Sequence, residues 1–522
     1  MFMNTQNKIA LIVIILLAVS LRFFKLSEVP PAISWDEAAV GYNAWTIANF
    51  GQDEYGNGFP LMFKSFGEYK NPVDIYATAL SVKLFGLSEF STRLPVALFG
   101  VFNVILLFFL TKALLNNNLI ALAAAFFLSI SPMNIHFSHF NHEANLALFF
   151  FMLGFYLFML TIKGKKFLLF AFICFILSFF SYNAPKMFIP VFIFFLIVIY
   201  RKELLKLSGQ QLFFSICLIV FFSFILFLNP HALGIDRAAQ TISFKLNKNE
   251  LFGQINLVAA QYSLHFLPDF LIIRGDKNPR LSAQVTGEFY YLDIVFLIAG
   301  VIFIFRKRSK ELLILFLWAF IAPLPSSITA EAPHAGRAMF MMGSWQIISA
   351  IGFYSVISLF RKKAFKLTVI IICLVIFGFS SFNFLSYYFG EYNKRYAIEW
   401  QYGMKQIVEF VKLHPEYHVV YMTDVRDQPY IFFLYYLKTL LPDYLQSVTY
   451  NKEESKSHNN VFFFDKYFFG GWNSVESMPQ RNVLYVFTPS QYDGLRYKLQ
   501  FDIKEIIYYP NETVAFYLVS IK

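Results

Sequence analysis

Between the first two apolar runs of the chain, residues 30–45 read PPAISWDEAAVGYNAW and residues 51–76 read GQDEYGNGFPLMFKSFGEYKNPVDIY. The acidic pair in this stretch, Asp36 and Glu37, stands a few residues beyond the end of a run with membrane-spanning character. Carboxylates this close to a lipid boundary are costly unless they face water or a partner. We therefore expect the stretch to fold onto the protein as a polar catalytic loop, with the rest of the chain as its support.

The composition around this loop is that of a multi-span membrane protein. Of the 522 residues, 57% are hydrophobic and only 15% are charged, which is too apolar for a soluble globule. About eleven apolar runs of bilayer-crossing length recur along the first three-quarters of the chain. They lie at residues 9–24, 94–111, 119–135, 144–162, 167–182, 187–200, 212–229, 289–305, 311–325, 338–360 and 366–384. The predicted class is an all-α polytopic membrane protein.

The net charge of +11 is concentrated in short basic clusters at the ends of the apolar runs. It therefore predicts orientation in a membrane rather than binding to nucleic acid. The clusters occupy alternate connections, which we expect to be cytoplasmic: Lys8; Lys112; Lys163, Lys165 and Lys166; Arg201, Lys202 and Lys206; Arg306, Lys307, Arg308 and Lys310; Arg361, Lys362, Lys363 and Lys366. The opposite connections carry the polar motifs. We expect those motifs to converge on one extracytoplasmic face.

The pattern changes near residue 385. Residues 386–522 alternate amphipathic stretches with short β-like runs such as HVVYMT, NVLYVFT and TVAFYLVSI. This predicts a small α/β domain outside the membrane, on the same side as the polar loops. The expected organisation is a transmembrane catalytic domain at residues 1–385, with outer loops at 26–93 and 230–288, and an extracytoplasmic domain at 386–522.

The first outer loop offers residues for proton transfer and for phosphate binding. Asp36 is a candidate general base, because a carboxylate can accept the proton of an attacking hydroxyl or amine. The alternative is helix capping, since acids in a first helical turn suit the helix dipole. Further along, Lys70 is a candidate phosphate ligand, Glu68 a candidate sugar or metal ligand, and Tyr69 lies between them. An ordinary surface turn would also explain this second motif.

The other outer connections add histidines, arginines and further polar groups. Arginine suits a lipid phosphate because its fork can hold two oxygens at once, although interfacial arginines also simply extend toward the membrane surface. Histidines at a membrane edge usually bond to loop backbone or water, so metal binding is the minority interpretation of HFSHFNHEAN at 136–145. The candidates are His139 and Glu143 in that stretch, Tyr182 and Lys186 in SYNAPK, Arg274 and Asp276 in RGD, and His334 and Arg337 in EAPHAGR.

Several nucleotide-dependent chemistries have no support in the sequence. It contains no Walker loop, no dinucleotide-binding GxGxxG in a strand–helix setting, and no GxSxG elbow. An enzyme that faces outward has no access to nucleotide sugars. If the protein transfers a group, its donor is expected to be linked to a lipid.

On these motifs the chain resembles the GT-C glycosyltransferases of family 39, which include protein O-mannosyltransferases and lipid A aminoarabinose transferases. The resemblance covers residues of about 21–352 and lies in six ordered stretches: PPAISWDEAAVGYNA, KLFGLSEFSTRLPVALFG, SPMNIHFSHFNHEANL, SYNAPKMFIP, FLPDFLIIRGDKNPR and LPSSITAEAPHAGRA. His139 stands where the family more usually has an arginine. The implied architecture is the GT-C fold with about eleven transmembrane helices.

The resemblance implies inverting transfer of a hexosyl or pentosyl group from a polyprenyl-phosphate carrier to a protein, lipid or glycan acceptor. It places the protein in the cell membrane as a multi-pass enzyme, with the active site and the C-terminal domain extracytoplasmic. Asp36 is then the catalytic base, with Glu37 beside it. The donor phosphate is expected at Lys70, Arg274, His334 and Arg337, and the substrates at Glu68, Tyr69, His139, Glu143, Tyr182, Lys186 and Asp276.

Two points stay open on the sequence. A divalent metal, with Asp36 and Glu68 as its ligands, is compatible with the family, and no other cofactor is implied. The alternative function is a non-enzymatic carrier or flippase for lipid-linked sugar intermediates. A carrier would require charged residues lining both halves of the membrane domain, whereas here the charges outside the basic clusters gather on one side.

Overall fold

The computed structural model describes residues 4–242, 250–452, 459–472 and 479–522. By contacts the chain forms two compact units. Unit 1 comprises Met1–Phe24 and Val96–Tyr387, and unit 2 comprises Lys25–Pro95 and Tyr388–Lys522. The first outer loop therefore groups with the C-terminal segment rather than with the apolar helices.

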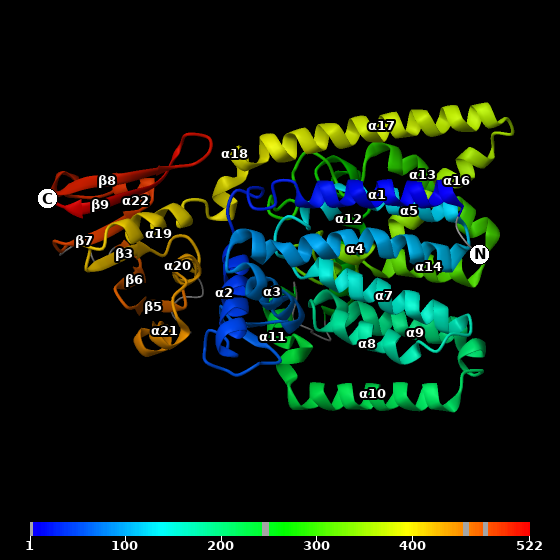
Figure 1. The fold of residues 1–522 in the computed structure, drawn as a ribbon, viewed down its shortest axis with the longest axis horizontal. Coiled ribbons are helices and arrows are strands. Elements are labelled where there is room, and N and C mark those ends of the chain that lie inside the picture. The colour runs from blue at the N-terminus through cyan, green and yellow to red at the C-terminus, as the bar shows by residue number, and fades with distance from the viewer. Residues whose placement is uncertain (1–3, 243–249, 453–458, 473–478) are drawn as a thin grey trace. The chain divides into compact units, whose positions relative to one another are not determined.

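Each expected apolar run coincides with a helix, and Figure 1 shows the long helices of unit 1 extending in roughly the same direction. These helices are α1 (Thr5–Phe23), α4 (Glu89–Leu115), α5 (Asn118–Ser129), α7 (Ala144–Ile162), α8 (Leu168–Phe179), α9 (Ala184–Leu204), α10 (Gly209–Leu228), α13 (Tyr291–Lys307), α14 (Lys310–Ile321), α16 (Ser344–Ser358) and α17 (Lys363–Gly390). Within the described residues, seven helical segments are long and apolar enough to cross a membrane. The multi-pass helical class is confirmed, while the number of eleven crossings stays a prediction.

Glycines set the closest helix packing in unit 1. A Cβ on Gly300 of α13 would lie 2.1 Å from the backbone oxygen of Ile348, and a Cβ on Gly352 of α16 would lie 1.8 Å from that of Phe296. No side chain fits at either position. Small residues let helix backbones approach closely in membranes, where burial of apolar surface gives little net drive.

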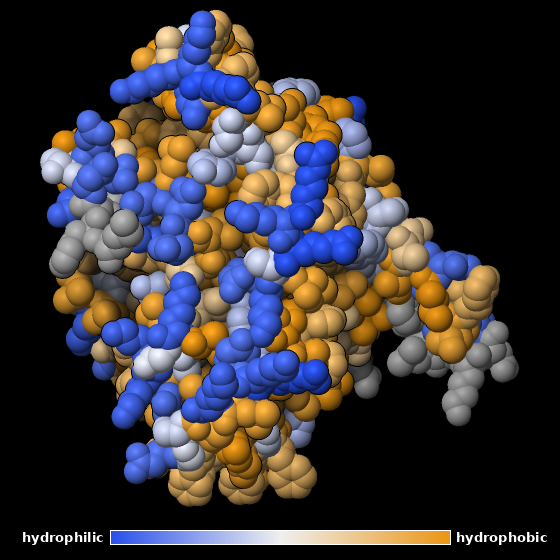
Figure 2. Space-filling view, turned by 90° about the vertical axis from the view of Figure 1, so that its right-hand side faces the viewer, coloured by the Kyte–Doolittle hydropathy of each residue, from blue (hydrophilic) through white to orange (hydrophobic). Residues whose placement is uncertain are grey.

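Hydrophilic side chains gather at one end of unit 1, on the face seen in Figure 2. The N-terminus and the α9–α10 and α16–α17 connections lie at this end (Figure 1). Basic residues occupy the last turns of α9, with Arg201 and Lys202, and of α13, with Arg306 and Lys307. This is the distribution that the positive-inside rule describes. The assignment of this end to the cytoplasm stays a prediction.

Unit 2 contains the first outer loop and a seven-stranded mixed sheet. The loop forms α2 (Trp35–Phe50), the antiparallel pair β1 (Phe63–Ser65) and β2 (Glu68–Lys70), and α3 (Pro72–Phe85). The sheet order is β4-β5-β6-β3-β7-β9-β8, with β3 parallel to β6 and β7 and the other pairs antiparallel. The strands are β3 (Val419–Thr423), β4 (Thr449–Tyr450), β5 (Val461–Phe464), β6 (Tyr467–Gly470), β7 (Val483–Phe487), β8 (Phe501–Tyr508) and β9 (Val514–Ile521). The expected C-terminal α/β region is confirmed.

The two segments of unit 2 share one hydrophobic core, which includes residues of α2 and α3 together with residues of the sheet and its helices. Two of these helices, α20 (Pro429–Leu437) and α21 (Leu441–Ser447), supply buried aromatic rings. Gly41 of α2 permits the contact with α20, because a Cβ there would lie 2.5 Å from the ring of Tyr435. The Tyr435 hydroxyl is 2.8 Å from Oγ1 of Thr92. The expected catalytic loop is thus packed against the C-terminal segment.

Candidate functional site

The start of α2 separates the two members of the acidic pair. Ser34 and Glu37 form a capping box, in which the Glu37 N–H donates to Ser34 Oγ at 3.3 Å and the Ser34 N–H donates to Glu37 Oε2 at 3.0 Å. The Glu37 carboxylate also receives the Arg93 Nε–H at 2.9 Å, and both side chains are fully buried. Arg93 donates in addition to the backbone oxygens of Pro30 and Ala32. This geometry favours a supporting role for Glu37 over the predicted catalytic one.

Asp36 faces the opposite way and meets Lys70. The Lys70 Nζ lies 2.5 Å from Asp36 Oδ1; the Asp36 side chain is 46% exposed and that of Lys70 only 7%. Lys70 ends β2, and the ring of Phe66, in the turn before β2, lies 5.5 Å from its ammonium. The sequence predicted both residues from separate motifs, and the structure places them together as an accessible carboxylate beside an enclosed cation.

Glu68 and Tyr69 share strand β2 with Lys70. Side chains alternate along a strand, so Glu68 and Lys70 belong to one face and Tyr69 to the other. Among the described residues no group of three or more His, Cys, Asp or Glu side chains is arranged to hold a metal ion. Metal binding by Asp36 and Glu68 stays a prediction.

In unit 1 the structure brings together polar residues from three outer connections, which we call the outer-loop cluster: His142, Glu143, Tyr182, His334 and Arg337. The Tyr182 ring lies edge-on to His142 at 5.2 Å, and Glu143 Oε2 is 3.8 Å from the His142 imidazole. A Cβ on Gly336 would lie 3.0 Å from His142 Nε2 and 3.3 Å from His334 Cε1, so the two imidazoles flank this glycine.

Arg337 and His334 differ in their charge state. The Arg337 guanidinium donates to Thr329 Oγ1 at 2.8 Å and to Glu331 Oε2 at 2.9 Å, and is mostly enclosed. Burial, reinforced by the nearby Arg337, holds the pKa of His334 well below its ordinary value. The imidazole is therefore neutral near pH 7, and it can offer a hydrogen bond but no charge to a ligand.

Of three other predicted residues, Asp276 and His139 are buried and Lys186 is half-buried. Asp276 accepts the backbone N–H groups of Asn278 at 2.8 Å and Ala335 at 2.6 Å, and burial raises its pKa to about 6. Asp276 therefore ties the loop after η3 (Asp269–Ile273) to the His334 loop. The ring nitrogens of His139 lie 2.8 Å from the backbone oxygen of Ile135 and 3.2 Å from that of Phe24. The Lys186 ammonium is buried above the ring of Phe179.

Arg274 is not held in this cluster. Its side chain is 70% exposed, and its Nε lies 3.5 Å from Asp269 Oδ1. An exposed pair of this kind holds neither side chain firmly. The predicted role of Arg274 in phosphate binding therefore has the weakest geometric support among the proposed ligands.

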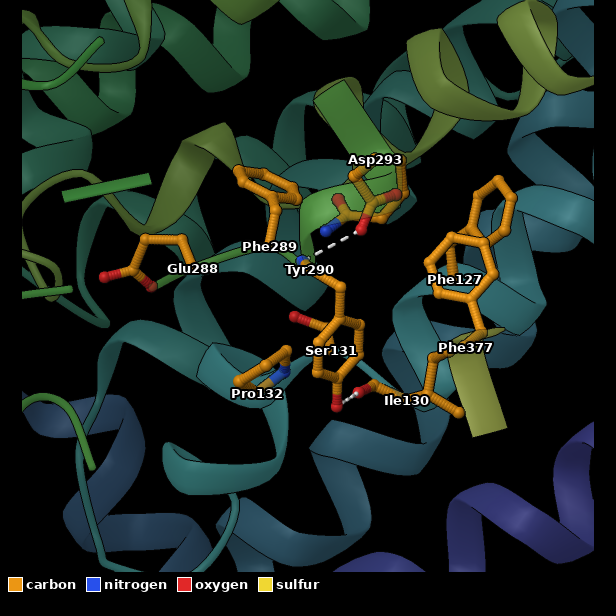
Figure 3. Close-up of a pocket in the computed structure, with 10 residues that line it drawn as sticks. Phe127, Ile130, Ser131, Pro132, Glu288, Phe289, Tyr290, Asp293 and Phe377 are labelled. Carbon is orange, nitrogen blue, oxygen red and sulfur yellow. Dashed lines mark hydrogen bonds between the residues drawn. The ribbon is translucent and has the colours of Figure 1, made fainter. Parts of the chain in front are cut away.

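A small cavity of about 210 Å³ lies among the helices of unit 1 and is drawn in Figure 3. Aromatic rings of Phe127, Phe289, Tyr290 and Phe377 line it, together with Glu288 and Asp293. The Tyr290 backbone N–H donates to Asp293 Oδ2 at 3.1 Å, and the Tyr290 hydroxyl donates to the backbone oxygen of Ile130 at 2.9 Å. No part of this space is wide enough for a water molecule, so it cannot hold a sugar on a lipid carrier.

Sequence reasoning missed several residues that shape these sites. Arg93 and Asp293 stand at the edge of apolar runs, and a charged residue there is a signal for a buried partner. Glu54 lies in the loop already singled out, but adjacent acids in a polar loop usually face water. Tyr430 lies in an aromatic stretch whose partners depend on the tertiary fold.

Comparison with known proteins gives a match to one family model over part of the chain and several solved structures of similar fold. The chain has the fold of GT-C glycosyltransferases, and the resemblance expected from its motifs is confirmed. Residues 69–227 match the family model described as dolichyl-phosphate-mannose-protein mannosyltransferase. No curated protein matches the sequence significantly.

Solved structures with this fold include ArnT from Cupriavidus metallidurans, both in the apo state and bound to undecaprenyl phosphate. These structures align with TM-scores of 0.60 and 0.61 at 12% identity, over 99% of this chain and 98% of theirs. The Archaeoglobus fulgidus oligosaccharyltransferase, tethered to an acceptor peptide, aligns with a TM-score of 0.56 at 15% identity, over 99% of this chain and 74% of its own. Identities this low establish the shared fold and no more.

Proposed function

We propose that the protein is a membrane glycosyltransferase that moves a sugar from a polyprenyl-phosphate carrier to an acceptor on the extracytoplasmic side. The observation that carries this proposal is the Asp36–Lys70 pair, an accessible carboxylate whose orientation is set by an enclosed lysine. The match to a mannosyltransferase family and the structural neighbours bound to undecaprenyl phosphate and dolichol phosphate support the choice of a lipid-linked donor.

In the proposed reaction Asp36 accepts a proton from the acceptor nucleophile. The nucleophile forms a bond to the anomeric carbon as the bond from that carbon to the phosphate oxygen breaks, and the electron pair leaves with the polyprenyl phosphate. A single displacement of this kind inverts the anomeric centre. Lys70 fixes the position of the Asp36 carboxylate, so that the base is oriented before the acceptor binds.

Negative charge grows on the phosphate as the bond breaks, and fixed positive groups are the most effective way to stabilise it. We assign this role to Lys70 and Arg337, with Arg274 as a weaker candidate. His334 is neutral and would donate a hydrogen bond to the phosphate. Glu68, Tyr69, Glu143, Tyr182 and Lys186 are the proposed substrate contacts, whereas His139, Asp276 and Glu37 are assigned to support.

The proposal is tested by incubating the purified full-length protein with radiolabelled polyprenyl-phosphate sugars and candidate acceptors. We expect release of polyprenyl phosphate that depends on both protein and acceptor. A carrier or flippase would instead move the labelled lipid between the leaflets of a vesicle without breaking it down. Transbilayer movement without release would overturn the assignment as an enzyme.

A further inference from the structure

In unit 2 a buried carboxyl group, that of Glu54, joins three elements. Asn43 Nδ2 of α2 donates to Glu54 Oε2 at 3.2 Å, and the Glu54 backbone N–H donates to Asn43 Oδ1 at 2.9 Å. From the C-terminal segment, the Tyr430 hydroxyl of α20 donates to Glu54 Oε1 at 3.3 Å. Glu54 and Tyr430 are almost completely buried. The carboxyl group thus links the loop after α2 to both helices.

A second contact connects Tyr430 to the reacting pair. The rings of Tyr430 and Phe66 meet edge to face at 6.2 Å, and Phe66 in turn lies over the Lys70 ammonium. Lys70 holds Asp36, which precedes Asn43 by seven residues, about two helical turns, on the same side of α2. The contacts therefore close a ring that runs from Asp36 through Lys70, Phe66, Tyr430 and Glu54 back to α2.

A hydrogen-bonded buried glutamate could simply stabilise the fold, but its electrostatics connect it to Lys70. Burial, with the adjacent Asp53, raises the pKa of Glu54 to about 8. Near pH 7 the carboxyl is therefore mostly neutral and does not compete with Asp36 for Lys70. Above pH 8 the Glu54 carboxyl ionises, and its negative charge then attracts the Lys70 ammonium. The positive charge of Lys70 in turn favours the ionised form of Glu54.

The phenols that face Glu54 do not change charge in this range. Burial raises the phenol pKa above its ordinary value in each of four tyrosines, Tyr42, Tyr55, Tyr430 and Tyr444. Burial also raises the pKa of Tyr450, to about 12. The two charged neighbours are Asp53 on the same loop and Lys70 on β2.

We propose that Glu54 and Tyr430 are positioning residues that set the pH range over which Lys70 stays engaged with Asp36, so that the C-terminal segment acts on the reaction through α20. The inference rests on the proposed function, since it assigns these residues to the support of its base. Neither residue touches the reacting atoms.

The test is the pH profile of sugar transfer by the full-length protein. We expect activity to fall as the pH rises through about 8. Glu54→Gln, which keeps the shape of the side chain without its charge, should abolish this fall. In Tyr430→Phe the ring contact to Phe66 remains, but Glu54 loses a donor that favours its ionised form. The fall in activity should therefore move to higher pH in this variant.

The matched control is Tyr435→Phe, on the same helix, whose hydroxyl bonds to Thr92 and not to Glu54. It should keep the wild-type profile. A purely structural role would lower the amount of folded protein without moving the profile, so unchanged profiles in Glu54→Gln and Tyr430→Phe would overturn the inference. Failure of the wild-type protein to release polyprenyl phosphate would overturn the proposed function itself, and retained activity in Asp36→Asn would overturn only the assignment of the base; both outcomes are separate from a change in the pH profile.

Discussion

At the level of single residues, two adjacent carboxylates have opposite environments because neighbouring helical side chains point about 100° apart. Asp36 reaches solvent beside Lys70, whereas Glu37 is enclosed with Arg93. The sequence predicted that this pair matters and offered helix capping as the alternative. The structure shows that Glu37 takes part in helix capping, while the role of Asp36 as a general base stays a proposal.

Removing one member of the buried pair should be strongly destabilising. Arg93→Met leaves the Glu37 carboxylate buried without its partner, which typically costs about 3–5 kcal/mol. We expect a large fall in the thermal unfolding midpoint in detergent. Lys498→Met, which breaks the exposed pair with Asp493, is the matched control and should leave the midpoint unchanged. Equal midpoints for the two variants would contradict the assignment of Glu37 and Arg93.

The two candidate phosphate-binding arginines should respond differently to the same substitution. Arg337 is held by Thr329 and Glu331, so Arg337→Lys loses a fixed, forked donor. We expect kcat to fall by about 10²-fold, as for loss of one fixed donor to a developing oxyanion. Arg274→Lys should have little effect, since Arg274 is exposed. Kinetics with the labelled donor would decide, and the reverse order would contradict the geometry.

At the level of secondary structure, hydropathy was sufficient to locate the helices, because each apolar run is long and bounded by charged or turn residues. Their packing was not predictable, because it depends on which small residues face another backbone. Gly352 meets the backbone of Phe296, whereas Gly378 of α17 has no atom within 4 Å of its would-be Cβ. Nothing in the sequence separates these two glycines.

This difference gives a paired prediction for the two glycines. Gly352→Ala places a methyl group against Phe296 and should lower the unfolding midpoint, because the helices must move apart. Gly378→Ala should keep or raise it, since alanine favours a helix by about 1 kcal/mol over glycine. Detergent unfolding curves of both variants check this. A Gly352→Ala protein as stable as wild type would contradict the close approach of α13 and α16 at Gly352.

At the level of the whole molecule, the sequence suggested a C-terminal domain that begins near residue 385. By contacts, residues 25–95 instead form one unit with residues 388–522, and they share its core. The reason is that α2 and α3 bury apolar faces whose partners lie more than 300 residues further along the chain. Hydropathy shows that such faces exist but not where they pack.

Removing the C-terminal segment should therefore damage the fold of residues 25–95. In a chain that ends at residue 387, α2 loses its packing against α20, and Tyr435 no longer meets Gly41. We expect limited proteolysis to cut residues 25–95 much faster than in the full-length protein. Cleavage at the wild-type rate would mean that the loop folds without the C-terminal segment.

The assignment of Asp36 as the base is tested most directly by the transfer activity of Asp36→Asn. The labelled polyprenyl-phosphate sugar is supplied at saturating concentration, and Asp493→Asn, from an exposed Asp–Lys pair in the same unit, serves as the control. We predict that Asp36→Asn is folded and binds the donor but releases no polyprenyl phosphate, while Asp493→Asn matches wild type. Release by Asp36→Asn at the wild-type rate would contradict the account.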